Sequence, residues 1–121
     1  MRHRVSKIKI KHGVGYNTAL MKNLAMSVII YDSIKTTAAK ANAVQPFIER
    51  LITIAKRGTT PATKKEAIRE IEKVLTHTNS SKKIFEVLLD KYKDRDSGFT
   101  RITKLGYRAG DNAPVVQIEL V

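Results

Sequence analysis

Residues 99–121 read Phe-Thr-Arg-Ile-Thr-Lys-Leu-Gly-Tyr-Arg-Ala-Gly-Asp-Asn-Ala-Pro-Val-Val-Gln-Ile-Glu-Leu-Val, and this stretch decides the fold class. Apolar and polar side chains alternate over residues 115–121, which is typical of a strand with one buried face. Residues 99–107 are rich in threonine, isoleucine and aromatic side chains, which favour strands. The residues between them have turn chemistry throughout. The stretch therefore predicts an antiparallel hairpin whose apolar face lies on the rest of the chain.

Upstream of the hairpin, apolar side chains recur at helical spacing and predict four helices. The expected helices run from a cap at Asn17 or Thr18 to about Tyr31, from Ala38 to about Arg57, from Pro61 to about Leu75, and from Asn79-Ser80 to the charged run of residues 91–96. More than half the circumference of the first helix is apolar, so we expect it to be the buried centre of the core, with Tyr31 on a buried face. In the fourth helix, Ile84, Val87, Leu88 and Tyr92 are expected to face inward.

The ends of the second and third helices carry recognisable signals. Thr37 is the predicted N-cap of the second helix and Gly58 its C-cap. Pro46 lies inside this helix, where it predicts either a kink or a fresh helix start. Thr60 and Pro61 predict the N-cap and first turn of the third helix, whose mixed-charge face we interpret as solvated.

A short strand over Ser33-Ile34-Lys35-Thr36 is expected to add a third strand to the hairpin. The predicted fold class is therefore α/β of the α+β kind, with about four helices packed on a small sheet. We assign residues 17–121 to a single domain and residues 1–16 to a basic N-terminal extension.

The first twelve residues hold five lysines and arginines, and the first acidic residue of the chain is Asp32. Each Lys or Arg that lies on a phosphate releases condensed counterions and adds affinity for a polyanion. The extension is therefore expected to lie on nucleic acid. A disordered basic tail without a function is the alternative.

The composition of the whole chain favours the same partner, since 23 lysines and arginines outnumber 11 aspartates and glutamates and give a formal net charge of +12. A membrane is a less favoured partner, because no segment combines this charge with a long apolar face that carries interfacial aromatic residues. The aliphatic run of residues 28–30 is too short for a signal peptide or a membrane span.

Catalysis is not expected. The chain has no cysteine, which excludes disulfides, zinc ribbons and thiol nucleophiles. His3, His12 and His77 are far apart, and none is at metal-ligand spacing with a second histidine or a carboxylate pair. Residues 13–15 lack the third glycine and the preceding strand of a phosphate-binding loop. We therefore expect no cofactor, no metal and no small-molecule substrate.

The candidate interface combines cations with hydroxyl and amide groups, which are the groups that contact phosphates. Apart from Tyr16 and Tyr107, exposed aromatic residues that could stack on bases are few, so the sequence favours recognition of folded nucleic acid through its shape and backbone. The candidate RNA-binding residues are Arg2, His3, Arg4, Lys7, Lys9, Lys11, Lys22, Asn23, Lys35, Thr36, Thr37, Lys40, Arg101, Lys104 and Arg108.

A small DNA-binding or nucleoid protein is the alternative from another class, because the charge alone would permit it. Such a protein needs a recognition helix with polar residues that read bases, and the first two helices here are too apolar for that role.

Blocks of sequence over nearly the whole chain resemble the seventeenth protein of the bacterial large ribosomal subunit. The resembling blocks are Met1-Arg2-His3-Arg4, residues 19–25, Ile34-Lys35-Thr36-Thr37 with Ala39-Lys40-Ala41, residues 51–56, residues 98–114, and Ile118-Glu119-Leu120-Val121. The chain departs from the family over residues 8–17, where members usually carry more Arg and His, and over residues 61–90, which match weakly.

The resemblance implies a non-catalytic domain that binds 23S-type large-subunit ribosomal RNA near the outer mouth of the peptide tunnel. It also implies neighbouring large-subunit proteins as partners and a role in subunit assembly and translation. A cytoplasmic ribosome is the expected location, and an organellar ribosome is the less favoured one.

Overall fold

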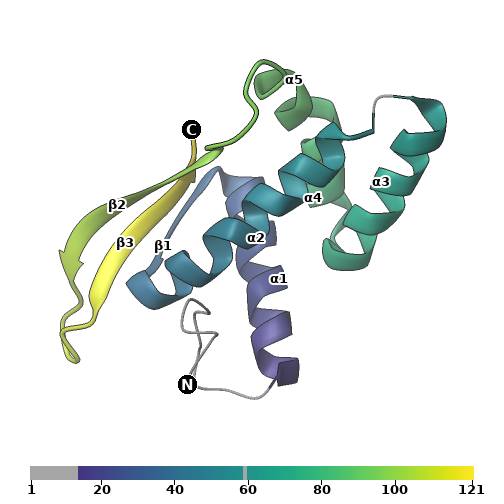
Figure 1. Ribbon diagram of the computed structural model, residues 1–121. Helices are drawn as coiled ribbons and strands as arrows, with labels where there is room; N and C mark the ends of the chain where they lie inside the picture. Colours follow the sequence, from purple (N-terminus) through teal and green to yellow (C-terminus); the bar gives the residue numbers. More distant parts are fainter. Residues whose placement is uncertain (1–13, 59) are drawn as a thin grey trace, which may run out of the picture.

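The computed structural model describes residues 14–58 and 60–121, without the side chains of Val14 and Tyr16. Its helices lie on one side of a three-stranded antiparallel sheet, and the hairpin extends past them at one end (Figure 1). This is the expected α+β fold. The elements are α1 (Val14–Tyr31), β1 (Ser33–Thr37), α2 (Ala38–Lys56), α3 (Pro61–Val74), α4 (Thr78–Lys83), the π-helical turn η1 (Ile84–Leu88), α5 (Leu89–Lys91), β2 (Thr100–Tyr107) and β3 (Pro114–Leu120).

The central strand of the sheet is β3, and β1 and β2 pair with it on either side. Ile118 lies opposite Ile34 in β1 and opposite Ile102 in β2. Val116, Ile118 and Leu120 are buried against the helices, because alternation places every second side chain of a strand on the same face. The predicted hairpin and the predicted third strand are both confirmed.

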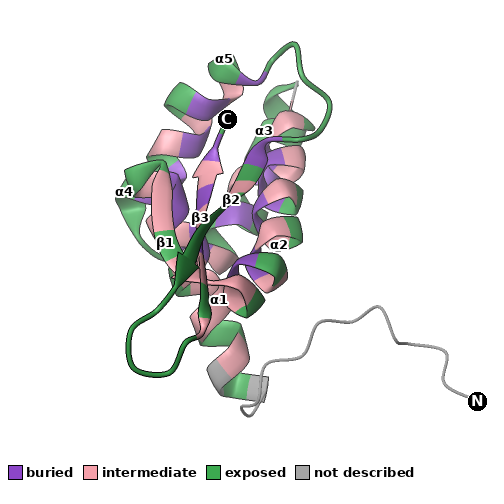
Figure 2. Ribbon diagram, turned by 90° about the vertical axis from the view of Figure 1, so that its left-hand side faces the viewer, coloured by how far each residue is buried: buried purple, intermediate pink, exposed green. Residues whose placement is uncertain are grey.

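The core lies between α1, α2 and the inner face of the sheet, where buried residues line the facing sides of these elements (Figure 2). Its side chains recur at three- and four-residue spacing, as expected for helices with one apolar stripe. On α1 they are Ala25, Val28 and Ile29, and on α2 they are Ala41, Val44, Ile48, Leu51, Ile52 and Ala55. The same core continues through Ile71, Leu75, Ile84, Leu88, Tyr92 and Phe99.

The first helix is longer than predicted. It begins at Val14, before the predicted caps Asn17 and Thr18, and so it includes residues that were predicted to belong to the N-terminal extension. Extending an existing helix by one residue is far easier than nucleating a new one, and a single glycine costs only about 1 kcal/mol. Gly15 therefore does not stop α1.

Two side chains that were predicted to face the core are exposed. Tyr31 is 71% exposed, because α1 ends there and Asp32, with a φ of 67°, turns the chain into β1. Val87 is 51% exposed. It lies in the π-helical turn, which holds more residues than an α-helical turn. Ile84 and Leu88 are therefore one turn apart, and both are buried. Val87 is rotated toward solvent.

The ends of α2 differ in detail from their predictions. Thr37 occupies the N-cap position, but its side chain makes no capping hydrogen bond. The helix continues through Pro46, so the predicted fresh start is wrong; burial of Val44 and Ile48 on either side outweighs the cost of the proline. Arg57, and not Gly58, is the C-cap residue.

Gly58 serves a close approach between α2 and α3. A Cβ atom at this position would lie 2.9 Å from the Cα of Lys64, which is closer than real Cβ atoms come. The start of α3 is as predicted: Thr60 is the N-cap, Pro61 is the first helical residue, and Thr60 and Thr63 form a reciprocal capping box.

The link into α4 is held by two buried serines. Ser80 Oγ donates to the carbonyl of His77 (2.7 Å), and Ser81 Oγ donates to the carbonyl of Leu75 (3.2 Å). The helix itself begins at Thr78 with His77 as its N-cap residue, slightly before the predicted start at Asn79-Ser80.

The base of the hairpin is anchored to the helices. The ring of Phe99 lies 4.9 Å from the ring of Tyr92, centroid to centroid, and the Tyr92 hydroxyl donates to the Phe99 carbonyl. Burial raises the pKa of this hydroxyl above its ordinary value. Thr100 Oγ1 donates to a carboxylate oxygen of Glu49 on α2 (3.1 Å). The hairpin is therefore fixed at one end and extends freely at the other.

Candidate nucleic-acid interface

The sheet has one face that no helix of the described chain covers (Figure 2). Directly paired residues in neighbouring strands point to the same side. Since Val116 and Ile118 point to the helices, the residues that alternate with them point away. The outer face consists of Ser33, Lys35 and Thr37 on β1, Val115, Gln117 and Glu119 on β3, and Arg101 and Thr103 on β2.

Three predicted site residues meet on this outer face: Lys35, Thr37 and Arg101. They come from two strands that are far apart in the sequence, and β3 lies between them. Sequence reasoning missed three uncharged polar residues of the same face, although the alternation of the strands could have found them. The missed residues are Ser33, Thr103 and Gln117.

The other predicted residues of the sheet lie on its helix-facing side. Thr36, Val116 and Lys104 form one row across the three strands. Lys104 is nevertheless exposed, because it lies on the edge strand β2. Lys40, in the first turn of α2, is half-buried. The predicted corner of Lys35, Thr36 and Thr37 therefore divides between two faces.

Two of the hairpin cations are held by carboxylates. Arg101 donates from Nε and Nη2 to one oxygen of Glu119, at 2.8 and 2.6 Å. Arg108 donates to both oxygens of Asp111, at 3.1 and 2.5 Å. The hydrogen bond from Arg108, aided by the backbone N–H of Ala113, lowers the pKa of Asp111 to about 2. Each guanidinium keeps further N–H donors that a phosphate can use.

The predicted residues of α1 belong to a different surface. Lys22 is half-buried and Asn23 is exposed. Asn23, Tyr31 and His77 line a hollow of about 470 Å³ between α1 and the link from α3 to α4. Because α1 lies on the helix side of the sheet, Lys22 and Asn23 are not brought to the outer face.

The N-terminal candidates Arg2, His3, Arg4, Lys7, Lys9 and Lys11 lie outside the described residues.

The described part of the chain has neither a candidate metal centre nor a candidate membrane span. Residues 14–58 and 60–121 contain no group of three or more histidine, aspartate or glutamate side chains that could hold a metal ion. No helix within these ranges has the length and apolar character that crossing a membrane requires.

Comparison with known proteins assigns the family. The sequence model described as "Ribosomal protein L17" matches residues 20–121. The chain belongs to the ribosomal protein L17 family. Among its relatives, the large ribosomal subunit protein bL17 of Erythrobacter litoralis is 40% identical over all 121 residues and 83% of its own length. The bL17 proteins of Maricaulis maris and Solibacter usitatus are 38% and 42% identical over the same 121 residues, which span 83% and 77% of their lengths.

Membership of the ribosomal protein L17 family makes the chain a structural constituent of the large ribosomal subunit and not an enzyme. The resemblance seen in the sequence is thereby confirmed. Family membership also decides against the nucleoid-protein alternative.

Proposed function

We propose that this protein binds large-subunit ribosomal RNA through the outer face of its sheet, the hairpin and the N-terminal extension. It does so near the outer mouth of the peptide tunnel, beside neighbouring large-subunit proteins, and it supports assembly of the subunit and translation on cytoplasmic ribosomes. The outer face carries this proposal, because it is uncovered in the described chain and offers hydroxyl, amide and cationic side chains together.

The charges of this end of the molecule suit a phosphate backbone. Within the described residues of the sheet and its turns, the acidic side chains are Asp32, Asp111 and Glu119, and each is in an ion pair. Lys35 and Lys104 are in no ion pair with a described residue. An RNA phosphate that approaches the outer face therefore meets cations and hydroxyl groups, and no unpaired carboxylate repels it.

Binding through phosphates has a characteristic salt dependence. Each neutralised phosphate releases counterions, so the affinity should fall steeply as salt rises. Wild-type protein should bind large-subunit RNA transcripts more tightly than duplex DNA of equal length at physiological salt. Equal affinity for the two would contradict the proposal.

The position in the subunit can be tested from single cysteines, because the natural chain has none. A Thr103→Cys variant places an iron chelate on the outer face, and a Glu72→Cys variant places one on α3 as the control. In reconstituted large subunits, hydroxyl radicals from position 103 should cut RNA segments around the tunnel mouth. Stronger cutting from position 72 would mean that the interface is assigned to the wrong end of the molecule.

A further inference from the structure

The hairpin contains a β-bulge that changes where Tyr107 points. Lys104 pairs with Val116, but the next pair along the hairpin joins Gly106 to Val115, so Leu105 is an extra residue in β2. In a regular strand Lys104 and Tyr107, three residues apart, would point to opposite faces. The extra residue cancels one step of the alternation, so both lie on the helix-facing side.

Glycine is required at the bulge for its backbone conformation. Gly106 has a φ of 128°, which other residues rarely adopt. A Cβ atom added there would meet no atom within 4 Å, so space does not explain the glycine. The bulge is thus encoded by the sequence, and its effect is to set the direction of the aromatic residue that follows.

The redirected side chains line a pocket. It has a volume of about 280 Å³ and lies between the hairpin and the first residue of α2. Its walls come from Ala38, Pro114 and Val116 and from the Gly106–Val115 pair at the bulge, and Lys104 and Tyr107 contribute the polar and aromatic groups. Tyr107 is 73% exposed, so most of its surface is available to another molecule.

The chemistry of this pocket matches one unstacked nucleotide. Aromatic side chains bind single-stranded bases by stacking, whatever the base, and a lysine ammonium binds the adjoining phosphate. The lining contains no carboxylate. Lys104 is in no ion pair with a described residue, so its ammonium is available to a phosphate.

We infer that the bulge-directed pocket receives an unpaired nucleotide of ribosomal RNA, with the base stacked on Tyr107 and a phosphate on Lys104. This inference rests on the proposed function and adds to it a contact with a base, where the sequence favoured recognition through shape and backbone. It also assigns the bulge a positioning role.

The experiment compares the affinity of variants for a large-subunit RNA transcript over a range of salt concentrations. Tyr107→Ala should weaken binding about fivefold to 100-fold, with an unchanged dependence on salt, because stacking releases few counterions. Tyr107→Phe should bind within about threefold of wild type, since it retains the ring. Tyr31→Ala removes another exposed tyrosine, on α1, and should have no effect.

Deleting Leu105 tests the positioning role directly. Without the extra residue the alternation becomes regular and Tyr107 moves to the outer face, so the deletion should weaken binding as much as Tyr107→Ala does. Thermal unfolding of each variant shows whether the fold is intact. Ultraviolet cross-linking of wild type should join Tyr107 to an unpaired base.

The outcomes separate this inference from the proposed function. If wild type binds the transcript with a steep salt dependence but Tyr107→Ala binds equally well, the inference is wrong and the proposed function stands. If wild type shows no preference for the transcript, the proposed function itself fails. If Tyr107→Ala instead loses a neighbouring protein in reconstituted subunits while its RNA affinity is unchanged, the pocket is a protein contact and the inference is wrong.

Discussion

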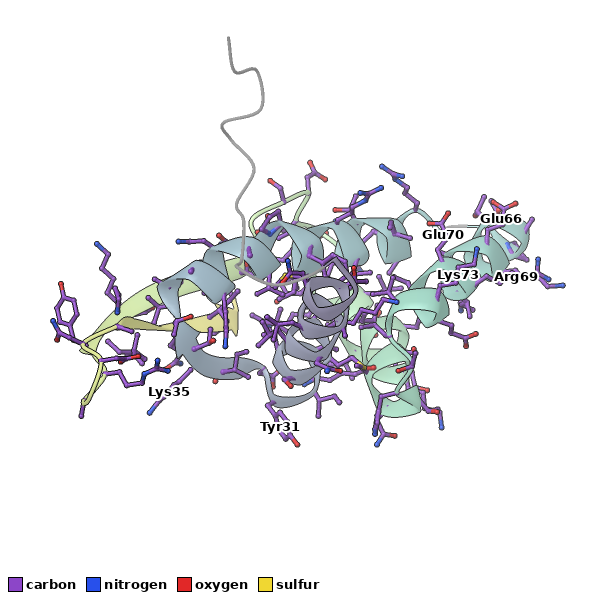
Figure 3. All side chains as sticks on the ribbon, turned by 90° about the horizontal axis from the view of Figure 1, so that it is seen from below. Tyr31, Lys35, Glu66, Arg69, Glu70 and Lys73 are labelled. Carbon is purple, nitrogen blue, oxygen red and sulfur yellow. The ribbon has the colours of Figure 1, made fainter. Side chains whose placement is uncertain are left out.

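The sheet and α3 lie at opposite ends of the molecule and use their charges differently. Lys35 extends from the sheet end, whereas the side chains of Glu66, Arg69, Glu70 and Lys73 extend from α3 at the other end (Figure 3). At the sheet end, the carboxylates of Asp111 and Glu119 are held by arginines. Along α3, none of the exposed glutamates is in an ion pair with any described residue.

This difference shows that charge content alone does not define an interface. Both ends carry lysines, arginines and acidic residues. At the sheet end, pairing neutralises the acids and leaves Lys35 and Lys104 in excess, on strands whose geometry is fixed by the core. On α3, free acids alternate with free cations on a solvated helix face, and isolated surface charges of this kind contribute little to stability or binding.

The largest expected effect is a loss of stability when a buried isoleucine of the sheet is truncated, compared with a half-buried isoleucine of α3. Ile118 is fully buried at the centre of the sheet, whereas Ile68 on α3 is half-buried. Ile118→Ala should lower the free energy of unfolding by about 2–5 kcal/mol, because it leaves a cavity. Ile68→Ala should cost about 1 kcal/mol. Urea unfolding measures both, and equal losses would mean that the half-buried Ile68 contributes as much to packing as Ile118 does.

The second largest effect should be on the salt dependence of RNA affinity, which should differ between lysine variants at the sheet end and on α3. Replacing Lys35 and Lys104 together by alanine should reduce the slope of log affinity against log salt by about 2, one for each lost phosphate contact. Replacing Lys64 and Lys65 on α3 by alanine is the matched control and should change the slope much less. Filter binding at several salt concentrations gives both slopes. The opposite ranking would place the RNA face on α3.

A smaller effect should follow from releasing a paired cation. Glu119→Gln removes the carboxylate that holds Arg101, so RNA affinity should rise by a few-fold as the guanidinium becomes available to phosphate. The free energy of unfolding should fall by less than about 1 kcal/mol, as for other surface pairs. Glu70→Gln on α3 should change neither quantity. A loss of affinity in Glu119→Gln would show that the pair positions Arg101 for RNA.

The smallest expected effect is on stability at acid pH, through the ionisation of Asp111. Because Arg108 lowers the pKa of Asp111 to about 2, the folded state favours the charged carboxylate. The stability that this provides is fully present above about pH 5, where the unfolded carboxyl is also ionised, and is lost as the pH falls toward 2. Nuclear magnetic resonance titration of Asp111 should show this low midpoint. In an Arg108→Gln variant the midpoint should return toward the ordinary value for aspartate.

The hairpin, the third strand and the capped start of α3 could be predicted because their signals are local. Alternation over residues 115–121 defines a strand face, and Thr60 with Pro61 defines a helix start. The two side chains that were wrongly predicted to be buried depend on features that are not local. The exposure of Val87 depends on a π-helical turn, and the exposure of Tyr31 depends on where α1 ends relative to the core, so neither can be read from helical spacing alone.

The sequence indicated which residue types form the candidate site, but it did not indicate on which face of the sheet each residue lies. Lys35, Thr36 and Thr37 are adjacent in sequence, but strand alternation divides them between two faces. The bulge at Leu105 has the opposite effect and brings Lys104 and Tyr107 to one face. The first result follows from alternation within β1 and could have been predicted, whereas the second needs the register of β2 against β3, which emerges only when the strands are paired. The cations of the N-terminal extension stay a prediction.

The position of β3 between β1 and β2 also sets the order in which the fold can form during synthesis. Ser33 pairs with Glu119, so β1 leaves the ribosome long before its partner strand exists. β2 depends on the same partner. The helices, whose contacts are local, can form while the chain is still growing, but closing the sheet requires a long loop to be ordered. Until then β1 exposes unpaired backbone groups that could pair with another chain. We expect the polar and charged side chains of β1 to disfavour such pairing in the newly made protein.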